Sequence, residues 1–310
     1  MSKTAFIFPG QGSQAVGMGK DLFDNFSISR EVFEEADDAL GFSLSEMCFS
    51  GTAEDLALTA NTQPAILTVS IAAFRAMVGE GFPIPDFVAG HSLGEYSALV
   101  AAGAMSFSDA VKTVRRRGNY MQDAVPFGTG AMAAILGLPL ETIEIACEEA
   151  KQTQVCSAAN INSPSQIVIA GNTEAIDRAI EILLGRGAKR AIRLNVSAPF
   201  HCALMLPAQE KLAADLQEID FQDLTVPIIE NVSAEANVKG ERVQTALTEQ
   251  VSKPVRWAQS IENLIVEEVE TFIEVGAGKV LSGLVKQISR DVRCLSVENS
   301  INLKEALNNL

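Results

Sequence analysis

Histidine is scarce in this chain of 310 residues and occurs only at His91 and His201. The five cysteines are scattered along the chain, without a C-x-x-C spacing. With two histidines and no clustered thiols, we expect no metal site. An odd number of cysteines without a pairing pattern also predicts reduced thiols and a cytoplasmic location.

Excess positive charge and long apolar runs are also missing. The chain has 24 Lys and Arg residues against 39 Asp and Glu residues, a formal net charge of −15, which argues against nucleic-acid binding. The first apolar run, residues 5–8, is too short for a signal peptide or a membrane span. We therefore expect a soluble protein with no membrane partner, whose length allows one large or two unequal domains. We also expect a monomer, although no feature of the sequence determines the oligomeric state.

The pentapeptide Gly90-His91-Ser92-Leu93-Gly94 has the form Gly-x-Ser-x-Gly. Residues 87–90 before it are typical of a short buried strand, and residues 95–102 after it predict a helix that ends at Gly103. Strand, glycine-flanked serine and helix together indicate a nucleophile elbow, where the helix start directs backbone N–H groups at developing negative charge. The alternative is an ordinary serine in a strand–helix turn, with His91 packed in the core.

A serine nucleophile needs a base that accepts its proton near neutral pH, and histidine is the usual one. His91 is adjacent to Ser92 in sequence, so on a tight turn its ring should point away from the hydroxyl. His201 is then the only other histidine that could activate Ser92.

Strands and helices alternate through the rest of the chain, which predicts an α/β fold with a hydrolase-like parallel sheet. We expect strands at residues 4–8 and 271–275 and helices at residues 64–78, 108–124 and 280–288. The loop Pro9-Gly10-Gln11-Gly12-Ser13-Gln14 lacks the lysine of a phosphate-binding loop. Gly276-Ala277-Gly278 also lacks the third glycine of a dinucleotide site, because Leu281 stands there.

The middle of the chain has the order β-α-β-β-α-β of a ferredoxin-like unit. We expect strands at residues 131–136, 155–159, 166–170 and 189–194, helices at 140–151 and 174–185, and a turn at 162–165. This predicts a small subdomain, residues 127–197, inserted into a catalytic body formed by residues 1–126 and 198–310. A cleft between the two would contain Ser92 and His201.

The run Arg115-Arg116-Arg117 lies on the helix expected at 108–124. Its apolar stripe excludes Arg116 from the buried face and only slightly favours Arg117 over Arg115. An inward arginine near a serine nucleophile could bind a carboxylate through two parallel hydrogen bonds. The alternative is a solvated basic face.

Seven motifs occur in the order found in a known family. They are Gly10-Gln11-Gly12-Ser13-Gln14, Thr62-Gln63-Pro64-Ala65, Gly90-His91-Ser92-Leu93-Gly94-Glu95, Arg117-Gly118-x-x-Met121-Gln122, Phe200-His201, Gln250-x-x-x-Pro254-Val255-x-Trp257 and Glu274-Val275-Gly276-x-Gly278-Lys279-Val280-Leu281. Over about residues 6 to 288 the chain resembles the malonyl-CoA:acyl carrier protein transacylases, the stand-alone malonyltransferases of dissociated fatty acid synthesis. It departs at Ala277, often proline in the family, and carries Phe200 where members vary.

The resemblance implies that Ser92 attacks the thioester of malonyl-CoA, with His201 as general base and then general acid. The backbone N–H groups of Leu93 and Gln11 would form the oxyanion hole. Arg117 would pair with the malonyl carboxylate and so select malonyl over acetyl.

The resemblance also implies that the main-chain carbonyl of Gln250 orients His201, and that Gln63, Met121 and Phe200 line the acyl pocket. The phosphopantetheine thiol of holo acyl carrier protein would then take the malonyl group from Ser92. No cofactor is implied, since malonyl-CoA is a substrate. Phe200 leaves little room for the extra methyl group of methylmalonyl.

An acidic enzyme with an acidic carrier and anionic coenzyme A needs a local basic patch. Candidates are Lys189 with Arg190, and Lys286 with Arg290. Three other functions stay open: an esterase or thioesterase, a non-catalytic module that binds carrier protein or coenzyme A, and a discrete acyltransferase of a polyketide pathway. A hydrolase would need an acidic partner for its histidine and no inward arginine, whereas a binding module would need no base.

Overall fold

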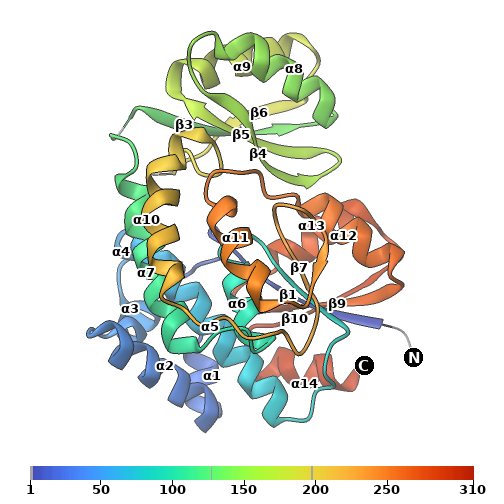
Figure 1. Ribbon diagram of the computed structural model, residues 1–310. Coiled ribbons are helices and arrows are strands. Elements are labelled where there is room, and N and C mark those ends of the chain that lie inside the picture. The colour runs from blue at the N-terminus through green and yellow to red at the C-terminus, as the bar shows by residue number, and fades with distance from the viewer. Residues whose placement is uncertain (1–2, 127, 197) are drawn as a thin grey trace.

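The structure, a computed structural model, describes residues 3–126, 128–196 and 198–310, and these fold around two sheets (Figure 1). The larger sheet has the strand order β10-β9-β1-β2-β7-β8. All its neighbouring strands pair in parallel except β7 and the edge strand β8. The strands are β1 (Lys3–Phe8), β2 (Phe87–Gly90), β7 (Ile228–Ile229), β8 (Ala236–Asn237), β9 (Val269–Val275) and β10 (Arg293–Val297).

Helices cover both faces of this sheet. Strand β1 shows why, since Phe6 and Phe8 pack into one apolar core while Ala5 and Ile7 pack into another on the opposite face. The helices are α1 (Lys20–Asn25), α2 (Ser27–Leu40), α3 (Leu44–Ser50), α4 (Ala53–Ala57), α5 (Thr59–Gly79), α6 (Gly94–Ala101), α7 (Phe107–Asp123), α10 (Leu206–Gln217), α11 (Gly240–Gln250), α12 (Trp257–Val266), α13 (Val280–Ile288) and α14 (Ser300–Asn308), with a 3-10 turn at Ala203–Met205.

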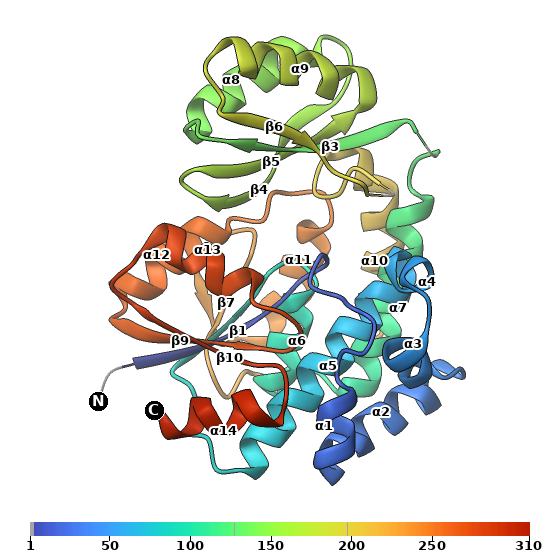
Figure 2. The same ribbon diagram turned by 180° about the vertical axis from the view of Figure 1, so that it is seen from behind.

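The smaller sheet is antiparallel, with the order β4-β5-β3-β6. Its elements are β3 (Gly130–Leu136), α8 (Leu140–Lys151), β4 (Cys156–Ser163), β5 (Gln166–Asn172), α9 (Thr173–Gly185) and β6 (Arg190–Arg193). Figures 1 and 2 show α8 and α9 on the face turned away from the larger sheet, so the other face is directed toward the body. The predicted ferredoxin-like order is therefore confirmed.

The division into domains stays a prediction. The expected small subdomain begins at residue 127 and ends at residue 197, and both residues lie outside the described part of the chain. Within the described residues, no helix is long and apolar enough to cross a membrane.

Several expected boundaries differ from those of the structure, and for three of them the contacts give the reason. Helix α5 begins at Thr59 rather than at Pro64, and the Ala60 carbonyl that Pro64 leaves without its helical partner accepts a hydrogen bond from Arg115 Nη1 at 2.7 Å. Helix α7 begins at Phe107, because the Ser106 hydroxyl caps it. Strand β4 continues to Ser163, where a turn was expected, since residues 160–163 pair with β5.

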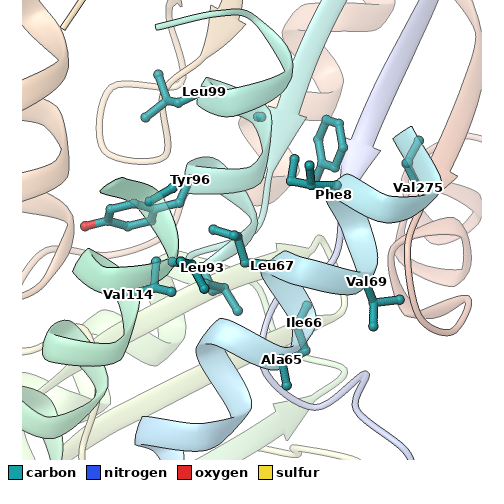
Figure 3. Close-up of a cluster of buried hydrophobic side chains, with 14 of the residues drawn as sticks. Phe8, Ala65, Ile66, Leu67, Val69, Leu93, Tyr96, Leu99, Val114 and Val275 are labelled. Atoms are coloured by element: carbon teal, nitrogen blue, oxygen red, sulfur yellow. The ribbon is translucent and has the colours of Figure 1, made fainter. Parts of the chain in front are cut away.

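The core beneath the pentapeptide anchors it. Figure 3 shows Leu93 among Leu67 of α5, Tyr96 of α6 and Val114 of α7. The Leu93 side chain is fully enclosed in this core. Burial of Leu93 holds the backbone around Ser92 in place while leaving its polar groups free for other contacts.

Candidate active site

Ser92 lies in the sharp turn between β2 and α6, with a positive φ of 52°. The turn requires glycine on both sides. A Cβ atom on Gly90 would lie 1.9 Å from the carbonyl carbon of Gly94, and a Cβ atom on Gly94 would lie 2.0 Å from the carbonyl oxygen of Phe8. The strand, turn and helix of the predicted elbow are therefore present, with backbone strain at the serine itself.

The Ser92 hydroxyl lies beside the more distant histidine in sequence. Ser92 Oγ is 2.8 Å from His201 Nε2, and His201 Nδ1 is 2.7 Å from the main-chain oxygen of Gln250. That carbonyl can only accept, so Nδ1 carries the proton and Nε2 is free to accept one from the serine. Burial, reinforced by the charge of Arg117, lowers the pKa of His201 to about 3, which keeps the imidazole neutral.

His91 points away from Ser92, as the sequence predicted. Its Nε2 atom is 2.8 Å from Asn162 Oδ1 on β4, and its ring lies 5.6 Å from that of Trp257. Burial lowers the pKa of His91 as well. His91 thus links the body to the smaller sheet and does not act as the base for Ser92.

Arg117 is the inward member of the arginine run, and only 1% of its surface is exposed. Its Nη2 atom donates to Ser92 Oγ at 3.0 Å and to Gln250 Oε1 at 2.8 Å, while Nη1 donates to Gln63 Oε1 at 2.8 Å. Arg115 instead binds the Ala60 carbonyl, and Arg116 pairs with Asp215. Periodicity could not separate Arg115 from Arg117, but the packing of α7 against α5 does.

Two polar residues near Ser92, Asn231 and Glu95, were missed as site residues, and so was the side-chain role of Gln250. Asn231 Oδ1 accepts from the Ser92 backbone N–H at 2.7 Å, and Asn231 Nδ2 donates to the Gly90 carbonyl at 2.6 Å. The side chain of Gln250 donates from Nε2 to Glu95 Oε2 at 2.6 Å and to the Ser92 carbonyl at 2.9 Å. A carboxylate at an otherwise apolar, buried helix position, Glu95, was the one sequence signal for this network.

A cavity of about 120 Å³ opens above Ser92. Every residue that the sequence placed in the site borders it except Gln250, which lies behind Arg117. The cavity is lined by Gln11, Gln63, His91, Ser92, Leu93, Arg117, Met121, Met132, Asn160, Leu194, Val196, Phe200 and His201. Met132, Asn160, Leu194 and Val196 come from the inserted segment, so the cavity lies where the two parts of the fold meet.

Gln11 and Leu93 border this cavity from two loops that follow parallel strands, and each has a backbone N–H group. Neither N–H group donates a hydrogen bond to another residue in the described part of the chain. Two free N–H groups beside a serine hydroxyl are what an oxyanion hole requires.

The glycine-rich loop before α13 does not form a phosphate site. The carboxylate of Glu274 accepts from the backbone N–H groups of Leu281 and Ser282 at 3.0 and 2.7 Å, so it already occupies the helix N-terminus. Among residues 3–126, 128–196 and 198–310 there is no group of three or more His, Cys, Asp or Glu side chains that could hold a metal ion.

The candidate basic patch is weaker than expected at one of its positions. Lys286 Nζ donates to the carbonyls of Arg290 and Val292 at 3.2 and 2.5 Å. Its ammonium group is therefore already bound to the backbone of the turn after α13. A docking role for Lys286 with Arg290, or for Lys189 with Arg190, stays a prediction.

An acyl-transfer site needs a serine, a histidine that accepts its proton and a group that orients the histidine, and Ser92, His201 and the Gln250 carbonyl provide these. The comparisons with known proteins indicate the same class of protein. The family model described as the acyl transferase domain matches residues 5–305 of the chain. The protein is an acyltransferase.

Two similar proteins define its family more narrowly. The chain is 50% identical over 311 residues to the malonyl CoA-acyl carrier protein transacylase of Bacillus subtilis, covering 100% of this chain and 98% of that one. A crystal structure of an acyl carrier protein S-malonyltransferase from Vibrio cholerae is 46% identical, with a TM-score of 0.97 over 98% of this chain and 100% of that one. The chain belongs to the malonyl CoA-acyl carrier protein transacylase family, which confirms the resemblance seen in the sequence and the predicted fold class.

One solved structure contains a partner. It is described as a type II PKS acyl-carrier protein in complex with its malonyl-transacylase, and its matched chain is 44% identical, with a TM-score of 0.97 and complete coverage of both chains. In that complex the carrier protein is bound to the transacylase.

Proposed function

We propose that this protein transfers a malonyl group from malonyl-CoA to the phosphopantetheine thiol of an acyl carrier protein, through a malonyl ester on Ser92. The observation that carries the proposal is the position of Ser92 Oγ, 2.8 Å from His201 Nε2 and 3.0 Å from Arg117 Nη2. A base and a carboxylate-binding cation meet at one hydroxyl. The family of the chain and the names of its relatives support the same assignment.

In the first half-reaction, His201 Nε2 takes the proton of Ser92 Oγ as the oxygen attacks the thioester carbonyl. The negative charge that develops on the carbonyl oxygen is stabilised by the N–H groups of Leu93 and Gln11, each worth about 3–4 kcal/mol in comparable sites. The C–S bond then breaks, and the leaving thiolate takes the proton back from His201. The Gln250 carbonyl holds the imidazole in the tautomer that this exchange needs.

Arg117 selects the acyl group. In the free enzyme one of its Nη2 protons is bonded to Ser92 Oγ, a hydrogen bond that is given up when the oxygen becomes an ester. The malonyl carboxylate can then take that donor together with the second Nη1 proton, because Gln63 uses only one of the two. An acetyl group offers no such partner, so Arg117 favours malonyl.

In the second half-reaction, the phosphopantetheine thiol gives its proton to His201 and attacks the ester carbon. Ser92 Oγ leaves, recovers the proton from His201, and the malonyl thioester of the carrier protein departs. None of these steps uses a cofactor or a metal, since the acyl group passes only between sulfur and oxygen. We further propose a monomeric, cytoplasmic enzyme that supplies extender units for fatty acid synthesis.

Intact-protein mass spectrometry tests this proposal. After brief mixing with malonyl-CoA we expect a gain of one malonyl group that maps to Ser92, and its loss when holo acyl carrier protein is added. An unchanged mass with accumulating free malonate would instead identify a hydrolase. No mass change and no turnover would leave only a binding role.

A further inference from the structure

Gln250 has a side-chain role that is separate from its main-chain contact with His201. Its amide oxygen accepts from Arg117 Nη2 at 2.8 Å, and its amide nitrogen donates on the opposite side. The two ends of an amide are not interchangeable, because oxygen only accepts and nitrogen only donates. The contacts of the nitrogen end therefore decide whether the oxygen faces Arg117.

Both protons on Gln250 Nε2 are used. One is directed at the Ser92 carbonyl at 2.9 Å and the other at Glu95 Oε2 at 2.6 Å, while Asn231 Oδ1 lies farther from Nε2, at 3.5 Å. If the amide rotated by half a turn, the nitrogen would meet the guanidinium donors of Arg117 and the oxygen would meet the Ser92 carbonyl. The observed orientation is thus the one in which donors and acceptors match.

Glu95 makes its closest contact with Gln250. It is the second residue of α6, 2% exposed, and in the described part of the chain it takes part in no ion pair within 4.0 Å. Its other described contacts are two long ones, each 3.4 Å, from the backbone N–H of Asn231. The 2.6 Å bond to Gln250 is its shortest contact.

We propose that Glu95 is a positioning residue for malonyl recognition, which holds the Gln250 amide so that its oxygen fixes the guanidinium of Arg117. The proposal rests on the function assigned above to Arg117. It concerns Glu95 as an acceptor rather than as a charge. Removing the acceptor leaves one N–H of Gln250 with only the long contact to Asn231 Oδ1 at 3.5 Å, and the amide has to shift away from Arg117 to satisfy it better.

The protonation state of Glu95 is compatible with this role. Burial, assisted by the nearby charge of Glu230, raises its pKa to about 8, whereas the hydrogen bond from Gln250 and the charge of Arg117 act in the other direction. Oε2 can accept from Gln250 in either protonation state, so the contact does not depend on the charge of Glu95. A glutamine at this position would offer nearly the same shape and the same acceptor.

The test compares Glu95→Leu with Glu95→Gln in single-turnover acylation of Ser92 by malonyl-CoA and by acetyl-CoA, followed by intact mass. We expect the malonyl-to-acetyl rate ratio to fall roughly tenfold in the leucine variant, the size of coupling within one hydrogen-bond network. The glutamine variant should keep the ratio within about threefold of the unaltered protein. Acetyl serves as the internal reference because it makes no use of Arg117.

One control variant tests whether loss of any nearby buried carboxyl changes the ratio, and one substitute variant is kept in case the leucine variant does not fold. Glu230→Leu removes another buried carboxyl that does not contact Gln250, and should leave the ratio unchanged. If Glu95→Leu does not fold, Glu95→Asp replaces it, since its shorter side chain cannot reach Gln250 at 2.6 Å, and the ratio should fall there too.

An unchanged ratio in a folded leucine or aspartate variant, or an equal loss for both acyl groups, would overturn the proposal. The proposal would also be overturned if the malonyl-to-acetyl rate ratio fell as far in the glutamine variant as in the leucine variant. Failure of the unaltered protein to form malonyl-Ser92 would instead refute the proposed function, so the two failures are distinguishable.

Discussion

The two sheets of this protein contribute unequally to the candidate active site. The parallel sheet and its connections carry Ser92, Arg117, His201 and Gln250, which are linked in one network by hydrogen bonds of 3.0 Å or less. The antiparallel sheet contributes cavity wall, chiefly Met132 and Asn160, and one hydrogen bond to His91.

The difference follows from sheet geometry. In a parallel sheet the carboxyl ends of neighbouring strands meet at one edge, so the loops after β1 and β2 converge there. The N–H groups of Gln11 and Leu93 and the hydroxyl of Ser92 belong to those loops. In an antiparallel sheet the carboxyl ends of neighbouring strands lie at opposite edges, so their loops do not converge. Here one face of that sheet is directed toward the body. Chemistry therefore depends on the body, and the shape of the cavity depends on both parts.

The two histidines give the strongest test of this division. We expect His201→Ala to slow acylation of Ser92 by about 10³–10⁴-fold, because it removes the general base. His91→Ala removes a half-buried imidazole whose partner is on the smaller sheet, and we expect a loss of less than about tenfold with a lower melting temperature. Rapid-mix intact mass and thermal unfolding measure both effects. Similar rate losses in the two variants would contradict the division.

Arg117→Ala should have the next largest effect. We expect malonyl transfer to fall by about 10²-fold or more, since a buried charge-assisted contact to the carboxylate is lost, while acetyl transfer is kept or raised. Steady-state rates with both acyl-CoA substrates measure this. Arg115→Ala is the matched control on the same helix and should not change the preference. Equal loss of both activities in Arg117→Ala would disprove the carboxylate-reading role.

The pH dependence of acylation should be shallow on the acidic side. Because burial lowers the pKa of His201 to about 3, its base form persists as the pH falls from 7 to 5, whereas an exposed histidine would lose most of its base form. Glu95, with a pKa near 8, stays protonated across the same window. We expect the acylation rate constant to change by less than about twofold between pH 7 and pH 5. Stopped-flow or quenched-flow acylation at constant ionic strength measures it, and a midpoint near pH 6.5 would contradict the prediction.

Asn162→Ala should have the smallest effect on chemistry. It leaves His91 Nε2 buried without its partner, which should lower the free energy of unfolding by about 1–3 kcal/mol. The acylation rate should stay within about threefold, because Asn162 touches no group that reacts. Denaturant unfolding and rapid-mix acylation on the same sample test both halves. A large rate loss without loss of stability would give the smaller sheet a chemical role.

Much of the catalytic centre could be predicted from local sequence. Gly90, Ser92 and Gly94 define an elbow by themselves, since only glycine fits beside so tight a turn. With two histidines in the chain and one of them adjacent to the serine, His201 followed by elimination. The ferredoxin-like order followed from hydrophobic periodicity, which is a short-range property. Pattern reading omitted the short helices α1, α3 and α4, of 6, 7 and 5 residues, and also α2, whose 14 residues carry a readable amphipathic pattern.

Only the tertiary structure decided which arginine turns inward and how the amide network closes. Arg115 and Arg117 flank the same apolar stripe, and the close approach of Gly118 to Ala60 is what settles the rotation of α7 against α5. Glu95 and Gln250 lie 155 positions apart, and no local pattern links them. Periodicity encodes which face of an element is apolar, but a hydrogen bond between distant side chains depends on where whole elements finally pack.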